Sequence, residues 1–405
     1  MAPAGDFPSL DAAIKAGADA VYFGVKGFNM RAGAKNFSVA EIGKVAAICK
    51  RAGVKSYITL NTIYYENELK KLERLIVKIA EAKIDAVIAW DFGAIALAKK
   101  HGVEVFLSTQ ASVANALSAA QYFEKFGIHR FVLARECSLD DIAKIKRGML
   151  EKFGKDAEIK IEVFAHGAMC VSQSGRCFMS TFACGKSANR GECMQPCRRE
   201  YRIEDANGNG FVVGNGYVLS PKDLCTIGFI EKVFAAGADS LKIEGRNRNP
   251  EYVFATVSAY RKLRDFYFAN RRKPNFAADF AKMKSDAIAE VSKVFNRGFS
   301  DGFFMGKPVG DWTSDGNKAT AKKRIVGHVI RFFPKISVAE ISIDNTPISV
   351  GDKIQIEGKN SGYTEVLVES MQIEGKNVQN APKGSNIGLK VPTPLKKADL
   401  VYILK

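Results

Sequence analysis

The sequence predicts an α/β fold: a (β/α)8 TIM-like barrel with a Cys-rich insertion, a helical linker and a small C-terminal β-barrel. Short apolar strands alternate with amphipathic helical segments over the first 270 residues, a pattern typical of parallel β/α architecture. In addition, AGADAVYFG at 16–24 recurs as AGADSLKIEG at 236–245, as expected of repeated strand–helix units. We expect the barrel at 1–270, the linker at 271–318 and the second domain at 319–405.

Seven barrel strands are expected, at residues 20–24, 57–61, 86–90, 105–109, 130–135, 159–167 and 240–245. The segments between them, such as 40–52, 66–82, 115–126 and 139–153, carry apolar residues at three- and four-residue spacing, which predicts helices. A TIM barrel needs one more strand. Because Ala2-Pro3-Ala4-Gly5-Asp6 resembles the loop after a strand, we expect the first strand to be truncated.

The alternation is interrupted once, after the strand at 159–167. We expect residues 167–222 to form an insertion, and all six clustered cysteines fall within it or just beyond it. The loops that follow barrel strands build the active sites of TIM barrels, so the insertion marks the expected site. After the linker, short strands and turns from about residue 322 onward predict a small β-barrel.

Composition and charge restrict the class of protein. Hydrophobic residues make up 47% and charged residues 25% of the 405 residues, which excludes a disordered chain. No apolar run reaches the roughly 18 residues of a membrane span, and MAPAGDFPSL has no signal-peptide pattern, so we expect a cytoplasmic protein without a membrane partner. The net charge of +17 favours a polyanionic partner such as RNA; a merely lysine-rich surface is the alternative.

Six of the eight cysteines lie between residues 170 and 225. In a large chain without an export signal, this clustering favours a metal or cluster site over disulfides. Structural zinc is bound by close cysteine pairs, and only Cys193 and Cys197 approach that spacing. Loosely spaced thiolates from several loops favour an iron–sulfur cluster; zinc and no metal remain the alternatives.

The segment EVFAHGAMCVSQSGRCFMS, residues 162–180, contains every fixed position of the pattern E-x-F-x-x-G-A-x-C-x(4)-G-x-C-x-x-S. With APAGD, GADAVYFG, NRGECMQPCR, KDLC and KIEGR, it resembles the collagenase-like U-32 peptidase family over essentially the whole chain. The chain is most similar to the tRNA-hydroxylation branch, whose members form 5-hydroxyuridine at the wobble position with prephenate as the implicated hydroxyl source.

The resemblance implies a [4Fe–4S] cluster held by Cys170, Cys177, Cys193 and a fourth cysteine that best matches Cys225, with Cys197 as the competing fourth ligand. It implies a tRNA hydroxylation enzyme that binds tRNA and a small organic acid. A collagenase-like peptidase is the first alternative. A cluster-bearing scaffold for a partner enzyme is the second, and such a protein partner is unknown.

Other candidate residues lie near predicted strand ends. His166 should face the barrel mouth, and Glu162, four residues earlier, should point the same way and orient it; each has the alternative of a buried structural residue. Glu244 is a third catalytic candidate, unless it only neutralises an arginine. Arginines bind carboxylates in bidentate fashion, and those expected to bind the organic acid are Arg31, Arg135, Arg176 and Arg246.

The peptidase alternative has little motif support. The sequence contains neither HExxH nor GxSxG and has four histidines. A cysteine protease needs a thiol with a histidine base, and Cys170 with His166 is the available pair. A cluster bound to Cys170 would leave that thiolate occupied.

Overall fold

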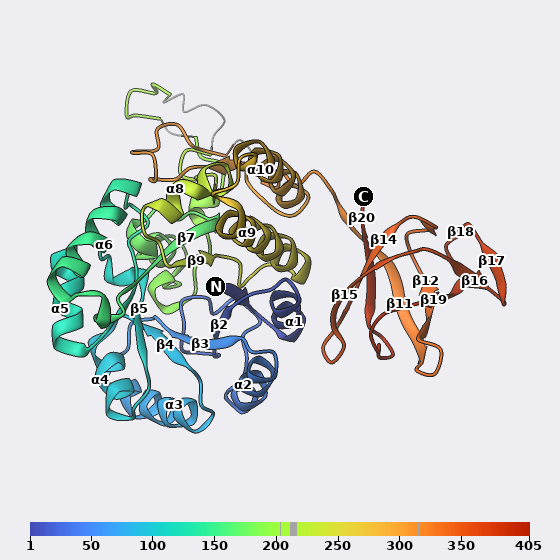
Figure 1. Cartoon of the computed structure of the whole chain (residues 1–405), viewed down its shortest axis with the longest axis horizontal. Coiled ribbons are helices and arrows are strands. Elements are labelled where there is room, and N and C mark those ends of the chain that lie inside the picture. The colour runs from blue at the N-terminus through green and yellow to red at the C-terminus, as the bar shows by residue number, and fades with distance from the viewer. Residues whose placement is uncertain (203, 211–216, 314–315) are drawn as a thin grey trace.

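A computed structural model describes residues 1–202, 204–210, 217–313 and 316–405. The first domain contains parallel strands surrounded by helices, and the antiparallel strands of the second domain lie at one end of the long axis (Figure 1). The parallel strands run in sequence order and are β1 (Ala2–Ala4), β2 (Ala20–Gly24), β3 (Lys55–Leu60), β4 (Ala86–Ala89), β5 (Val105–Leu107), β6 (Arg130–Val132) and β7 (Lys160–Ala168), with β9 (Ser240–Ile243) parallel to β7.

The first strand corrects one expectation. Ala2–Ala4 form β1 itself and pair with β2, so these three residues are not the loop after a strand. The other end of the strand series lies close by: the Met1 amino group donates to Leu241 O over 2.6 Å, and Ile243 N–H donates to Met1 O over 3.1 Å. The first and last strands of the series are therefore joined through Met1.

Amphipathic helices cover the strands. Leu72, Leu75, Ile76 and Ile79 of α3 (Leu69–Glu81), at three- and four-residue spacing, are buried, and this apolar stripe packs toward the strands. Its counterparts are α1 (Phe7–Lys15), α2 (Ile42–Arg51), α4 (Phe92–Lys100), α5 (Ala116–Phe126), α6 (Leu139–Phe153), α8 (Ile230–Ala235) and α9 (Pro250–Asn270).

Two further strands extend the sheet beside the insertion. β8 (Asp223–Cys225) pairs antiparallel with the end of β7, and β10 (Phe299–Ser300) pairs with β8. Residues 271–318, expected to be a helical linker, contain α10 (Phe276–Ser292), which stacks on α9 through Phe266 and Phe280 with nearly parallel rings. This segment is thus packed against the first domain, and Val291 and Phe304 belong to its core.

The second domain is an eight-stranded antiparallel sheet with its own apolar core. It contacts α1 and α9: Tyr363 N–H donates to Asp11 Oδ2 over 2.7 Å, Lys15 Nζ donates to Tyr363 O over 2.6 Å, and Lys323 Nζ lies 2.8 Å from Glu251 Oε2. The sheet consists of β11 (Lys323–Phe333), β12 (Val338–Ile343), β14 (Lys353–Gly358), β15 (Gly362–Leu367), β16 (Met371–Ile373), β17 (Lys376–Val378), β19 (Asn386–Lys390) and β20 (Leu400–Leu404), and β13 (Ile348–Ser349) pairs with β18 (Asn380–Ala381) outside it.

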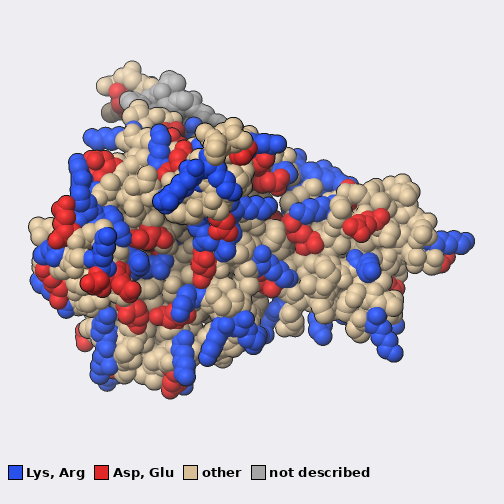
Figure 2. Space-filling model, in the orientation of Figure 1, with Lys and Arg blue, Asp and Glu red and all other residues tan. Residues whose placement is uncertain are grey.

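Lysine and arginine are spread over the visible face of the molecule, with aspartate and glutamate among them (Figure 2). The excess of positive charge is therefore distributed on this face and does not form one stripe. Among the helices of the described residues, none has the length and apolar character needed to span a membrane.

Candidate cofactor and substrate site

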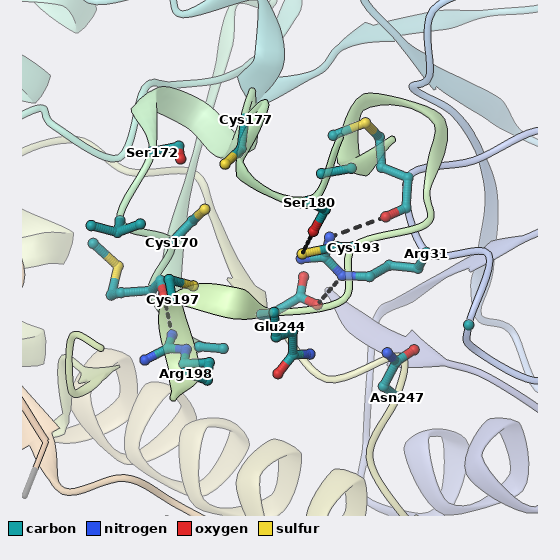
Figure 3. Close-up of a pocket in the computed structure, with 18 of the residues that line it drawn as sticks. Arg31, Cys170, Ser172, Cys177, Ser180, Cys193, Cys197, Arg198, Glu244 and Asn247 are labelled. Atoms are coloured by element: carbon teal, nitrogen blue, oxygen red, sulfur yellow. Dashed lines mark hydrogen bonds and ion pairs between the residues drawn. The ribbon is translucent and has the colours of Figure 1, made fainter. Parts of the chain in front are cut away.

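A cavity of about 350 Å³ lies where the insertion covers the carboxyl ends of the strands. We call it the outer cavity. Four cysteines line it: Cys170 follows β7, Cys177 precedes α7 (Met179–Cys184), and Cys193 and Cys197 lie on the segment after α7. Figure 3 shows their side chains around one space, with Arg31 and Glu244 drawn beside Cys193. Sequence positions spread over 28 residues are thus gathered at one site.

The donor set fits an iron–sulfur cluster better than a single ion. Within the described residues, no three His, Cys, Asp or Glu side chains are close enough to share one metal ion. The four thiols instead surround the cavity, and a four-iron cluster takes one thiolate from each of several directions. Burial raises the pKa of Cys197, as do the nearby Cys170, Cys193 and Cys177, while Arg198 lowers it.

Cys225 is placed differently from the other predicted ligands. It lies on β8, buried, and is not among the residues that line the outer cavity. Its neighbour is the Tyr260 hydroxyl, 4.0 Å from Sγ, and burial raises the pKa of its thiol to about 11. The structure therefore brings Cys197, the alternate candidate, to the other three cysteines in place of Cys225.

The tripeptide Asn189-Arg190-Gly191 anchors the insertion to the loops after β2 and β3. Asn189 Oδ1 accepts from Cys177 N–H over 3.0 Å, and Asn189 O accepts from the Thr62 hydroxyl over 2.8 Å. Gly191 O accepts from Ala32 N–H over 2.9 Å. Gly191 has φ of +90°, and a Cβ there would lie 2.4 Å from Asn29 O, so the close approach requires glycine.

Arg31 and Glu244, which also line the outer cavity, form an ion pair, with Nε 3.4 Å from Oε1. The Tyr22 hydroxyl contacts the other carboxylate oxygen, also at 3.4 Å. Burial alone would raise the pKa of Glu244, but the charges of Arg31, Arg246 and Arg135 outweigh it and lower the pKa to about 2. Glu244 is therefore a permanent anion among arginines and does not hold a proton at neutral pH.

A smaller inner cavity of about 40 Å³ lies among the strand ends below, and Arg31 and Glu244 line it too. Arg135 stacks on Phe164, 4.1 Å from the ring centre, and Arg246 donates to Thr59 Oγ1 over 2.7 Å. The Nε atoms of Arg135 and Arg246 are buried without a hydrogen-bond partner among the described residues. Unsatisfied buried donors are costly, so these two are suited to binding an anion.

The fourth predicted arginine lies elsewhere. Arg176 is exposed, donates to the Ser112 hydroxyl over 3.0 Å and stacks beside Trp90. It lines neither of the two cavities. Three of the four predicted arginines therefore converge, and Asn61 and Gln110 lie with them in the inner cavity.

Glu162 and His166 do not form the expected pair. Glu162 is fully buried, 3.1 Å from Arg130 Nε and 3.4 Å from Lys242 Nζ; burial would raise its pKa, but these cations lower it to about 2. A register shift between Phe164 and His166 adds one residue to β7, and such a bulge turns the following side chain to the other face.

His166 therefore packs on the outer side of β7. Its ring lies 5.6 Å from Tyr260 and 5.6 Å from Phe299, and Nδ1 is 3.4 Å from the Tyr260 hydroxyl. Burial lowers the pKa of His166 to about 3. Among the described residues no histidine lines the outer cavity, so the thiol–histidine pair of a cysteine protease is not assembled there.

Sequence reasoning did not select three further arginines of the outer cavity, Arg198, Arg248 and Arg297. Arg198 is the last residue of the motif NRGECMQPCR. Arg248 and Arg297 stand within the short polar segments RNRNP and NRGF, where nothing in the local pattern separates a cavity arginine from a surface one.

The comparisons with known proteins agree with the motif pattern. The model of peptidase family U32 matches residues 5–314. The chain is 39% identical to a protein named "Collagenase" from Porphyromonas gingivalis, over 99% of this chain and 96% of that protein. It is 36% identical to the tRNA hydroxylation protein P1 of Bacillus subtilis, over 76% of this chain and 71% of that protein.

A third relative is the 23S rRNA 5-hydroxycytidine C2501 synthase of Escherichia coli, 34% identical over 77% of this chain and 48% of that protein. Among solved structures, the U32 peptidase Mk0906 matches 44% of this chain and 68% of that chain, with 12% identity and a TM-score of 0.33. The family match and the relatives together cover nearly the whole chain. This chain belongs to peptidase family U32.

Proposed function

We propose that this protein is an iron–sulfur-dependent RNA hydroxylation enzyme that forms 5-hydroxyuridine at the tRNA wobble position, with prephenate as the hydroxyl source. One observation carries the proposal: four cysteines and an arginine–glutamate pair line the same cavity at the carboxyl ends of the strands. The relatives named as tRNA and rRNA hydroxylation proteins support the class of reaction.

Cys170, Cys177, Cys193 and Cys197 would hold the [4Fe–4S] cluster, which supplies one-electron redox chemistry when bound. The chain's own residues bind and orient the other reactants. Arg31, Arg135 and Arg246 would provide donors for the carboxylates of the organic acid, and those of Arg135 and Arg246 include buried Nε atoms. The insertion covers the cavity and limits the access of water to it.

Glu244 acts as a positioning residue in this proposal. Its carboxylate keeps Arg31 at the boundary between the two cavities. An incoming carboxylate would compete with Glu244 for the Arg31 guanidinium, so the acid binds where the protein already stabilises one negative charge. Its low pKa makes Glu244 unsuitable as a general acid at neutral pH.

Nucleoside analysis tests the proposal. Cells that lack the gene are supplied with the wild type, Cys193→Ser or Cys184→Ser, and tRNA is digested and measured by mass spectrometry. Cys184 is exposed and does not line the outer cavity, so its variant is the matched control. We expect 5-hydroxyuridine with the wild type and the control and its loss with Cys193→Ser. A change confined to 5-hydroxycytidine in ribosomal RNA would show that ribosomal RNA, and not tRNA, is the substrate. No change in any nucleoside would refute RNA hydroxylation.

The second candidate function is a peptidase, favoured by the 39% identity to the protein named "Collagenase". A thiol protease needs a histidine base within hydrogen-bond reach, and the described part of the outer cavity has none. The test is hydrolysis of collagen by the metal-free protein, with and without a thiol-blocking reagent. Cleavage that the reagent abolishes would establish the peptidase.

A further inference from the structure

Three arginines from separate segments line the outer cavity. Arg198 follows the cysteine segment, Arg248 lies between β9 and α9, and Arg297 lies between α10 and β10. They are distinct from the arginines of the inner cavity, since none of the three lines it. The outer cavity therefore has a second group of cations.

This group has little compensating negative charge. Arg297 pairs with Asp223 at 3.3 Å, and the two side chains are 12% and 3% exposed. Arg198 donates to neutral acceptors: Ser220 Oγ at 2.9 Å, Pro221 O at 2.5 Å, and Met169 O. Arg248 makes no hydrogen bond or ion pair through its side chain within the described ranges. Asp223 is thus the one carboxylate ion-paired with this group among the described residues, and the charge of Glu244 also acts on Arg248.

Arg248 is nevertheless held in place. Its guanidinium lies 3.5 Å from the centre of the Phe295 ring, and Arg297 lies 4.9 Å from the same ring. Stacking occupies the flat face of a guanidinium and leaves the N–H donors at its edge available. Burial and the charge of Arg297 lower the pKa of Arg248 by more than Tyr252, Asp223 and Glu244 raise it, so a further anion beside the pair would be stabilising. The stacked Arg248 guanidinium therefore keeps edge donors that could bind an anion.

The chemistry of the proposed substrate identifies the anion, and the inference rests on the proposed function. A nucleotide that is modified on its base inserts that base into a pocket, while its backbone phosphates remain outside and need cations there. We propose that Arg248 and Arg297 form a phosphate-binding subsite that holds the RNA backbone beside the nucleotide inserted in the outer cavity. The inner arginines then remain free for the carboxylates of the organic acid.

The experiment measures binding of a fluorescein-labelled anticodon stem–loop by anisotropy over a range of salt concentrations, under anaerobic conditions. The variants are Arg248→Gln and Arg248→Lys, and the described side-chain contact that they change is the stacking on the Phe295 ring. Arg147→Gln is the matched control: it removes one positive charge from the exposed surface of α6. Binding of prephenate to each protein is measured by calorimetry.

We expect Arg248→Gln to weaken RNA binding about tenfold at low salt and to reduce the slope of log K against log salt by about 0.7, the value for one phosphate of a single strand. Arg248→Lys should retain most of the slope, and Arg147→Gln should match the wild type. Equal slopes and affinities for Arg248→Gln and Arg147→Gln would overturn the subsite while leaving RNA hydroxylation intact. If Arg248→Gln weakened prephenate binding and left RNA binding unchanged, the site would bind the organic acid, and the phosphate-binding subsite would also be overturned. A wild type that binds no RNA would refute the subsite and the proposed function together.

Discussion

Arg31 and Glu244 form an ion pair, Nε to Oε1 at 3.4 Å, and both residues line the outer cysteine cavity and the inner arginine cavity. The pair thus stands at the boundary between the proposed cluster and the proposed acid site. Glu244 also raises the pKa of Arg31, which keeps that guanidinium charged. An acid that binds both cavities must displace or share this carboxylate.

The two members of the pair should have opposite effects on acid binding. Arg31→Gln removes a charged donor, and such hydrogen bonds contribute about 1.5–3 kcal/mol, so the Kd for prephenate should rise tenfold or more. Glu244→Gln removes the competing anion, so the Kd should fall. Calorimetry on the anaerobically purified proteins measures both. An equal weakening in the two variants would show that Glu244 does not compete with the acid.

The fourth cluster ligand can be identified by metal content. Cys197→Ser should lose most of the iron and acid-labile sulfide, about four of each per chain in the wild type, because Cys197 lines the outer cavity. Cys225→Ser should retain both, since Cys225 lies buried on β8 next to Tyr260. Iron retained in Cys197→Ser and lost in Cys225→Ser would restore Cys225 as the ligand.

Much of the fold could be predicted because periodicity depends on local sequence. The expected strand at 20–24 coincides with β2, and the one at 159–167 differs from β7 by one residue at each end. The first strand was missed because only three residues, Ala2–Ala4, form it. β8 and β10 have three and two residues, and strands this short leave no alternation to detect.

Site residues could be predicted from the sequence only where they directly follow a predicted strand. Arg31, Arg135 and Arg246 follow strands, and the carboxyl ends of parallel strands meet. The bulge at Phe164 is not visible in the sequence, yet it reverses the direction of His166. The spacing of the cysteines likewise does not show that Cys225 lies outside the outer cavity. The position of Cys225 depends on the pairing of β8 with β7, which the sequence does not reveal.

The position of the insertion should depend on Gly191. Gly191→Ala would place a Cβ 2.4 Å from Asn29 O at a residue with φ of +90°, whereas Gly185→Ala, at φ of +64°, meets nothing within 4 Å. Both substitutions carry the left-handed backbone cost of about 1–2 kcal/mol, but only the first displaces the anchor. Hydrogen exchange across residues 170–198 should become faster in Gly191→Ala alone, with loss of iron. Equal exchange in the two variants would show that the anchor tolerates the added methyl group.

The buried His166 should make stability depend on pH. Its pKa falls from 6.5 to about 3 because of burial, so below pH 6.5 the unfolded chain binds a proton that the folded chain does not. The free energy of unfolding therefore does not depend on His166 protonation above pH 6.5. It falls by about 1.4 kcal/mol per pH unit as the pH decreases from 6.5 toward 3. The pKa of Glu162 is lowered from 4.5 to about 2, so Glu162 contributes to the pH dependence only below about pH 4.5.

His166→Phe should therefore flatten the plot of unfolding free energy against pH between pH 6.5 and 5. The expected difference is about 2 kcal/mol in the free energy of unfolding measured with urea. Parallel curves for the variant and the wild type in that window would contradict the prediction and mean that His166 is protonated in the folded protein despite its position between Tyr260 and Phe299.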